Sequence, residues 1–268
     1  MNLQEYEDPY KLDLVGESYP ALTAKNARFI EAVISLDSNY KRDNEIKEPD
    51  KKFNMFNSTN NVYCGSSKYW FNEMMNGTKD YKECLLGAII SIDRMNSTHI
   101  EAAKFGRIKI LNIIYEKCKN LDELKEALKE PFDINNNHLI NLISTPLEAM
   151  NKNSCPRINL SFATKFCAYA CKHLNLGIEY SKYDFVVAKS LPAYCNIYLD
   201  ENLKEGYFLA NNCSGKMNIE EKKKYKLEVY KKYSKYIERI INEVRKKYNY
   251  KITKEEFDHI LWYGFKGN

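Results

Sequence analysis

The sequence lacks the features that mark membrane, secreted or metal-binding proteins. Its eight cysteines do not show the short, regular spacing of a zinc or iron–sulfur site, and none of its four histidines is paired with a cysteine or an acid at ligand spacing. We therefore expect free thiols in a reducing compartment, no metal and no cofactor. The N-terminus is charged, and no apolar run approaches the length of a membrane span. These absences predict a soluble cytoplasmic protein.

A large charge excess and a β-sheet pattern are also missing. The 41 Lys and Arg residues against 36 Asp and Glu residues give a net charge of only +5, which permits a nucleic-acid surface without requiring one. No segment alternates apolar and polar residues over a sustained length, and no repeat of fixed period is present. With 268 residues the chain can bury a substantial core, so we predict an all-α protein.

Apolar periodicity and capping residues predict the helices. Residues 37–52 are almost entirely polar and are expected to form a surface loop. Pro146 should kink or divide one helix, and Pro192 should end or bend another. The expected helices are 21–36, 67–75, 81–92, 99–117, 121–129, 137–150, one beginning near 162, one beginning after Asp184, 219–248 and 254–263.

One lysine and one aspartate in residues 161–191 have a spacing that can carry chemistry. Lys165 lies near the start of a predicted helix, and Asp184 comes directly before the next one, 19 residues later. An amine can attack an electrophilic carbon, and a carboxylate can serve as its base or stabilise positive charge. The structural alternative is equally simple: Lys165, Tyr169 and Lys172 fall off the apolar stripe, where a lysine is usually solvated, and Asp184 would only cap a helix.

Two stretches of this segment, SFATKFC at 161–167 and YDFVVAKSL at 183–191, resemble bacterial proteins of the 8-oxoguanine DNA glycosylase fold, within the helix-hairpin-helix (HhH-GPD) glycosylase superfamily. The closing FDHILWYG at 257–264 is similar to the same group's C-terminal ending. The resemblance implies one glycosylase-like unit over residues 1–268, with two helical lobes, a cleft between them and the catalytic hairpin at about 151–191. The 19-residue interval matches the interval in the 8-oxoguanine branch.

The resemblance also implies an activity: a DNA glycosylase with AP lyase activity, working in base excision repair in the cytoplasm of a bacterial or phage-infected cell. Its partner would be double-stranded DNA from which a modified, oxidised purine is flipped out. Lys165 would attack the sugar and form a Schiff base, and Asp184 would stabilise the transition state. Because glycines are absent from the hairpin, 153–165, phosphate contacts should be few.

Further site residues follow from the same resemblance. Arg157 and the helix start at Ser161 and Thr164 would contact phosphate, and Arg94 and Asn96 would approach the duplex from a loop at 93–96 that otherwise is an ordinary connector. Tyr169, Phe257 and Trp262 are the base-pocket candidates, with core packing as the alternative for the latter two. The missing glycines favour a second hypothesis, a non-catalytic DNA- or partner-binding protein built on the glycosylase fold.

Overall fold

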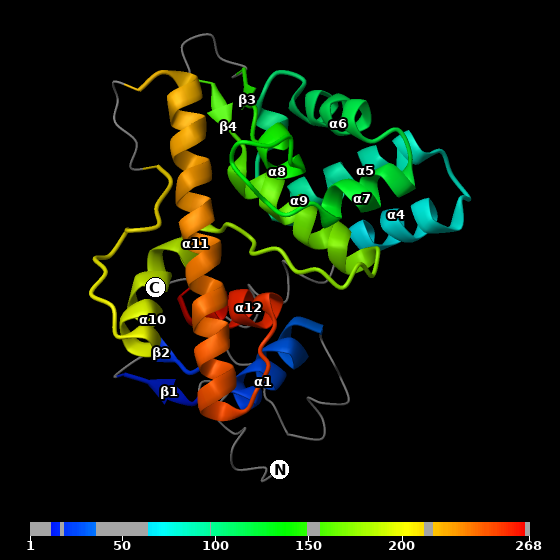
Figure 1. The fold of residues 1–268 in the computed structure, drawn as a ribbon. Helices are drawn as coiled ribbons and strands as arrows, with labels where there is room; N and C mark the ends of the chain where they lie inside the picture. Colours follow the sequence, from blue (N-terminus) through cyan, green and yellow to red (C-terminus); the bar gives the residue numbers. More distant parts are fainter. Residues whose placement is uncertain are drawn as a thin grey trace. The chain divides into compact units, whose positions relative to one another are not determined.

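A computed structural model describes residues 12–16, 19–35, 64–96, 98–148, 156–211 and 217–265, and these residues are mostly helical (Figure 1). In these ranges the β-structure consists of two antiparallel pairs of two-residue strands and one isolated bridge residue, Ala103. The prediction of a mostly helical protein is confirmed. The predictions for residues 37–52, for a cap at Ser97 and for the first part of the hairpin, 153–155, lie outside the described residues.

The chain divides into two compact units. Unit 1 combines Met1–Val62, Asp184–Phe208 and Lys235–Asn268, and unit 2 combines Tyr63–Tyr183 and Leu209–Ser234. The division falls immediately before Asp184 and also within α11 (Ile219–Tyr248), whose first half belongs to unit 2 and whose second half belongs to unit 1. Lys165 and Asp184 are therefore residues of different units.

Unit 2 is a group of helices around a buried central one, α9. Local caps explain where several helices begin: Asp80 accepts the backbone N–H groups of Lys82 and Glu83 at the start of α5, and Asn120 accepts that of Glu123 at the start of α7. Besides the first half of α11, its elements are α4 (Cys64–Asn76), α5 (Tyr81–Met95), η2 (Ile100–Ala102), α6 (Gly106–Lys117), α7 (Leu121–Lys129), α8 (Leu139–Ile143), β3 (Pro146–Leu147), β4 (Arg157–Ile158) and α9 (Leu160–His173).

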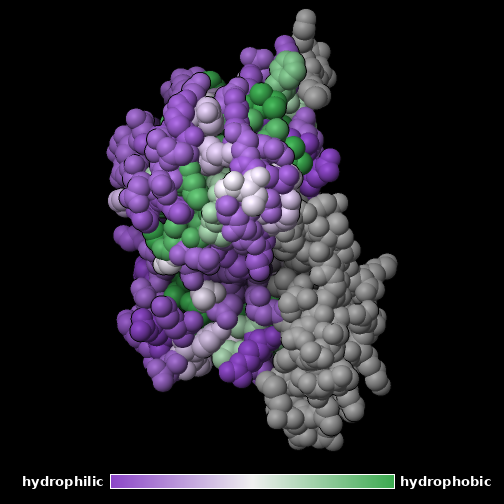
Figure 2. All heavy atoms as spheres, turned by 90° about the vertical axis from the view of Figure 1, so that its right-hand side faces the viewer, coloured by the Kyte–Doolittle hydropathy of each residue, from purple (hydrophilic) through white to green (hydrophobic). Residues whose placement is uncertain are grey.

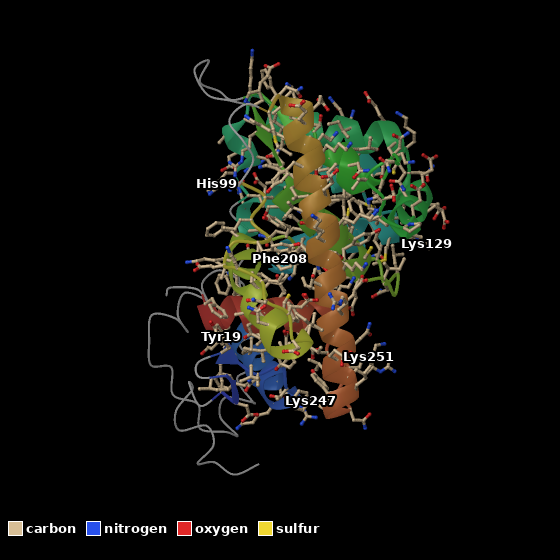
Figure 3. All side chains as sticks on the ribbon, turned by 60° about the vertical axis from the view of Figure 1, so that its left-hand side comes forward. Tyr19, His99, Lys129, Phe208, Lys247 and Lys251 are labelled. Carbon is tan, nitrogen blue, oxygen red and sulfur yellow. The ribbon has the colours of Figure 1, made fainter. Side chains whose placement is uncertain are left out.

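Unit 1 packs two helices that are distant in the sequence against a third. Its elements are β1 (Leu14–Val15), β2 (Tyr19–Pro20), α1 (Ala24–Ser35), α10 (Phe185–Leu199), the second half of α11 and α12 (Lys254–Phe265). Both α1 and α10 contact α12. Tyr194 of α10 is fully buried, donates its hydroxyl to the carbonyl of Pro20 at 2.7 Å and contacts the ring of Phe257. Lys247 and Lys251 lie on the exposed side of this unit (Figure 3).

The long helix α11 begins and ends at the predicted residues. Asn218 and Glu221 form a reciprocal capping pair at its start, in which each side chain accepts the other residue's backbone N–H. Its predicted apolar stripe is buried at Tyr230, Tyr233, Ile237 and Val244. The opposite face is charged, and hydrophilic residues also cover most of the described surface in the view of Figure 2. No described helix is long and apolar enough to cross a membrane.

Two predicted helices are shorter in the structure than the sequence suggested. The helix predicted at 99–117 is interrupted, because the chain turns at Phe105 with a φ of 54° and only then enters α6. Gly106 permits this turn, since a Cβ there would overlap the carbonyl oxygen of Ile100. The helix predicted at 137–150 ends at Ile143, and Pro146 instead begins strand β3.

Pro192 does not end its helix. It lies inside α10, which continues to Leu199. A proline inside a helix costs roughly 3 kcal/mol, because it removes one hydrogen bond and crowds the preceding turn. Here Leu191, Tyr194 and Cys195 are all buried, and the helix packs against α12. This burial offsets the local cost.

Candidate active site

Lys165 is a buried residue in the second turn of α9. Its side chain is only 5% exposed, although the apolar pattern predicted a solvated position. The pattern was misleading because α9 is enclosed on nearly all sides: it packs against α4, α5, α7 and α8, and ten of its fourteen residues are buried. Lys172, seven residues later, is exposed as predicted. Because lysines are rarely this deeply buried, Lys165 is a candidate for chemistry.

Asp184 is the N-cap of α10. One carboxylate oxygen, Oδ1, accepts the backbone N–H of Val186 at 2.9 Å, as the sequence predicts. The preceding residue is also fixed: Tyr183 donates its backbone N–H to the hydroxyl of Thr164 at 2.9 Å. Unit 2 thus contains a direct hydrogen bond between the residue before Asp184 and the residue before Lys165.

Tyr169 connects several parts of unit 2. It lies one turn after Lys165 on α9 and is 8% exposed. Its hydroxyl donates to Oδ1 of Asn96 at 3.4 Å, and its ring is stacked on that of His173 with centroids 6.0 Å apart. The ammonium of Lys182 lies 5.3 Å from the centre of the same ring. The predicted base-pocket residue is therefore surrounded by side chains from three segments of unit 2.

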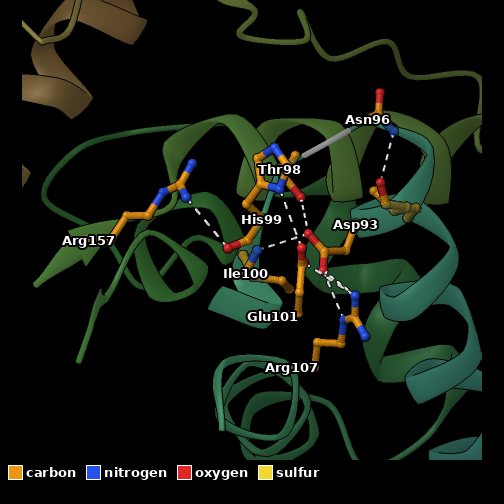
Figure 4. Close-up of polar contacts among 9 residues, drawn as sticks. Asp93, Asn96, Thr98, His99, Ile100, Glu101, Arg107 and Arg157 are labelled. Carbon is orange, nitrogen blue, oxygen red and sulfur yellow. Dashed lines mark hydrogen bonds and ion pairs between the residues drawn. The ribbon is translucent and has the colours of Figure 1, made fainter. Parts of the chain in front are cut away.

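The segment predicted as a loop at 93–96 is mostly helical. Helix α5 extends to Met95, so Arg94 lies exposed in its last turn and Asn96 is its C-cap. Asp93 lies within α5, and its fully buried side chain holds the chain that follows (Figure 4). Its Oδ1 accepts the hydroxyl of Thr98 at 2.6 Å and the N–H of Ile100 at 2.9 Å. After this anchored segment the chain forms η2 and then enters α6 at Gly106.

Arg107 completes this network. Its guanidinium binds Oδ2 of Asp93 at 2.8 and 2.9 Å and Oε2 of Glu101 at 3.2 Å. Burial raises the pKa of Asp93, an effect that the hydrogen bonds from Thr98, Ile100 and Arg107 oppose. Because Asp93 binds the residues on either side of His99, it fixes the exposed turn at His99, which has a φ of 55° (Figures 3 and 4).

The predicted phosphate-binding residues fall into two groups. Arg157 is exposed at the start of β4, and its guanidinium lies 3.5 Å from the carbonyl oxygen of His99, so it belongs to the same surface as that turn. Ser161 is half-buried in the first turn of α9. Thr164 is fully buried, and its hydroxyl donates to the carbonyl of Ser161 and accepts the N–H of Tyr183. The Thr164 side chain therefore holds the segment before Asp184 instead of facing a phosphate.

The other two base-pocket candidates belong to unit 1. Phe257 is completely buried in the core of that unit, against Tyr194, which supports the core-packing alternative. Trp262 is half-buried on α12. Unit 1 also contains a cavity of about 530 Å³, which begins at Phe185 and Val186 and extends along α10 to Phe265. Its rim carries the ion pair of Lys189 and Glu205, at 3.6 Å. This volume suits a small organic molecule.

Sequence reasoning missed Lys182, the Asp93 network and a pair formed by the buried His138 and the half-buried Tyr180. Lys182 stands in a break between helices, and nothing in the local pattern distinguishes it from a solvated lysine. The Asp93 network could have been predicted, because Thr98 and Arg107 follow Asp93 closely enough in the sequence for a short turn to bring them together. Among the described residues, no group of three or more His, Cys, Asp or Glu side chains could hold a metal ion.

Comparisons with protein-family models, with curated protein sequences and with solved structures gave no match. The resemblance to the glycosylase superfamily is therefore carried by the residues of the chain itself, at 161–167, 183–191 and 257–264. The family, the activity and the substrate stay predictions.

Proposed function

We propose that the protein is a DNA glycosylase with AP lyase activity, with a two-lobed helix-hairpin-helix fold, that removes an oxidised purine flipped out of duplex DNA. The observation that carries the proposal is the buried Lys165 beside Thr164, whose hydroxyl holds the residue before Asp184. A binding protein has no need of an amine buried at such a position, because a buried lysine costs stability.

In the proposed reaction, the uncharged amine of Lys165 attacks C1′ of the deoxyribose as the bond to the base breaks. The carboxylate of Asp184 stabilises the positive charge that develops on the sugar. Opening of the sugar ring gives a Schiff base between Lys165 and C1′, and elimination then releases the 3′ phosphate and nicks the strand. Oxidised guanine is proposed as the substrate on the resemblance alone.

DNA would be held mainly by Arg157 and by backbone N–H groups in the first turn of α9. The first N–H groups of a helix have no partner within the helix, and its N-terminus favours an anion. Arg94 and Asn96 remain in the proposal as residues that approach the duplex, Arg94 from an exposed position and Asn96 next to Tyr169. Thr164 contributes only through its backbone.

Borohydride trapping tests the mechanism, because it reduces a Schiff base to a stable protein–DNA adduct. The protein is incubated with a panel of duplexes, each carrying one modified base or an abasic site. We expect an adduct with the parent protein and none with Lys165→Gln. Lys172→Gln is the matched control, since it removes an exposed lysine from the same helix and should trap like the parent.

Asp184→Asn separates the chemical role of Asp184 from its structural role. Asparagine is as good an N-cap as aspartate, so α10 and duplex binding should be preserved while base release falls. Efficient trapping by Lys165→Gln would contradict the assignment of the nucleophile. DNA binding by the parent without base release or nicking on any duplex would favour the non-catalytic alternative. Release of alkylated or deaminated bases, with none of 8-oxoguanine, would remove only the proposed substrate.

A further inference from the structure

Unit 2 contains a second buried lysine beside Tyr169. Lys182 is 6% exposed, and its ammonium lies over the ring of Tyr169, 5.3 Å from the centroid. Tyr169 follows Lys165 by one helical turn, so that the two residues share one side of α9. A single aromatic side chain is thus next to Lys165 along the helix and under the ammonium of Lys182.

The backbone that carries Lys182 is fixed at three successive residues. The hydroxyl of Tyr230 donates to the carbonyl of Ser181 at 3.0 Å, and that of Tyr233 donates to the carbonyl of Lys182 at 2.9 Å. Tyr183 is held by Thr164, as described above, and its hydroxyl accepts the N–H of Ala210 at 2.7 Å. These hydrogen bonds fix the backbone from which the Lys182 side chain extends over the ring of Tyr169.

The position of Lys182 over an aromatic ring suits the role of a proton donor. The face of an aromatic ring attracts a cation, so the position over Tyr169 favours the ammonium form of Lys182. A nucleophile needs the opposite form, an amine with a free electron pair. Where neighbouring groups are held in different protonation states, one can act as the acid and the other as the nucleophile or base.

We infer that Lys182 is the proton donor for the leaving base. The inference rests on the proposed function, because it assumes that Lys165 attacks C1′. As the bond between C1′ and N9 breaks, its electron pair goes to the base, and a proton passes from the ammonium of Lys182 to a nitrogen of the base. The electron pair of Lys165 forms the new bond to C1′. The products are the free neutral base, a neutral Lys182 and a positively charged secondary amine at Lys165, so that the total charge is unchanged.

An abasic duplex separates this role from a structural one. Base release from a modified duplex needs a proton for the leaving base, whereas a ready-made abasic site has no base left to protonate. General acid catalysis contributes about 10²–10⁴-fold to a rate. We therefore expect Lys182→Gln to slow base release, measured in single turnover, by roughly 10²-fold or more. Nicking and borohydride trapping on the abasic duplex should stay within about threefold of the parent, well below that factor.

Two further variants complete the experiment. Lys182→Arg keeps the positive charge over Tyr169 but cannot give up its proton near neutral pH, so it should be as slow in base release as Lys182→Gln. Lys172→Gln should behave like the parent on both duplexes. Parent-like base release by either Lys182 variant would overturn the inference, as would an equal loss on both duplexes. A different result would show that the proposed function itself is wrong: trapping of the abasic duplex by Lys165→Gln.

Discussion

Unit 2 should lose stability on mild acidification because of one buried histidine. His138 is fully buried as the N-cap of α8, where its Nδ1 accepts the N–H of Ile140 at 3.1 Å. Its Nε2 lies 2.8 Å from the hydroxyl of Tyr180, and that hydroxyl donates to the carbonyl of Leu128 at 2.8 Å. With Nδ1 as an acceptor and Nε2 as a donor, the ring must be neutral. Protonation would remove the cap of α8 and bury a charge.

The size of the effect follows from the pKa in the two states. Burial lowers the pKa of His138 to about 4 in the folded protein, whereas the unfolded value is about 6.5. Because the folded pKa is the lower one, the unfolded state takes up the proton first. The stability is fully present above about pH 6.5 and is lost as the pH falls towards 4. Linkage gives a loss of about 2 kcal/mol between pH 7 and pH 5.

Denaturant unfolding at pH 7 and pH 5, followed by circular dichroism, measures this loss. Other groups also titrate in this range, so the informative quantity is the difference between the parent and His138→Asn. Asparagine can accept the same N–H as a helix cap but does not titrate. We expect the variant to be less stable at pH 7, since it loses the contact with Tyr180, but to lose about 2 kcal/mol less than the parent between the two pH values. Equal losses in both proteins would refute the reasoning.

Two further predictions concern the Asp93 network and Arg157. Asp93→Ala removes the buried acceptor of Thr98 and Ile100 and the ion-pair partner of Arg107, so we expect a loss of about 3 kcal/mol and a fall in Tm of roughly 6–12 °C. A thermal melt that shifts by less than about 2 °C would contradict this stabilising role of the network. Arg157→Ala should weaken binding to all duplexes alike and reduce the slope of log affinity against log salt by about 0.9, and an unchanged slope would mean that this surface does not face DNA.

Local interactions allowed the sequence to predict some elements correctly. Helix α7 begins after Asn120 and ends at Lys129 as predicted, and α11 runs over the predicted thirty residues. Their caps are made by side chains three residues apart, and their apolar stripes repeat within a few turns. The N-cap role of Asp184 has the same origin, since its partner is two residues away. Such signals are contained in a short window of sequence.

Tertiary packing decided the rest. The continuation of α10 through Pro192 depends on burial against α12, which a local rule cannot anticipate. Lys165 is buried because four helices surround α9, and Lys182 is brought to Tyr169 by two tyrosines of α11, about fifty residues later in the chain. The sequence alone determined which residue types and spacings could carry amine chemistry. The burial of the two lysines and their relation to Tyr169 depend on contacts between distant segments, and only the folded chain forms them.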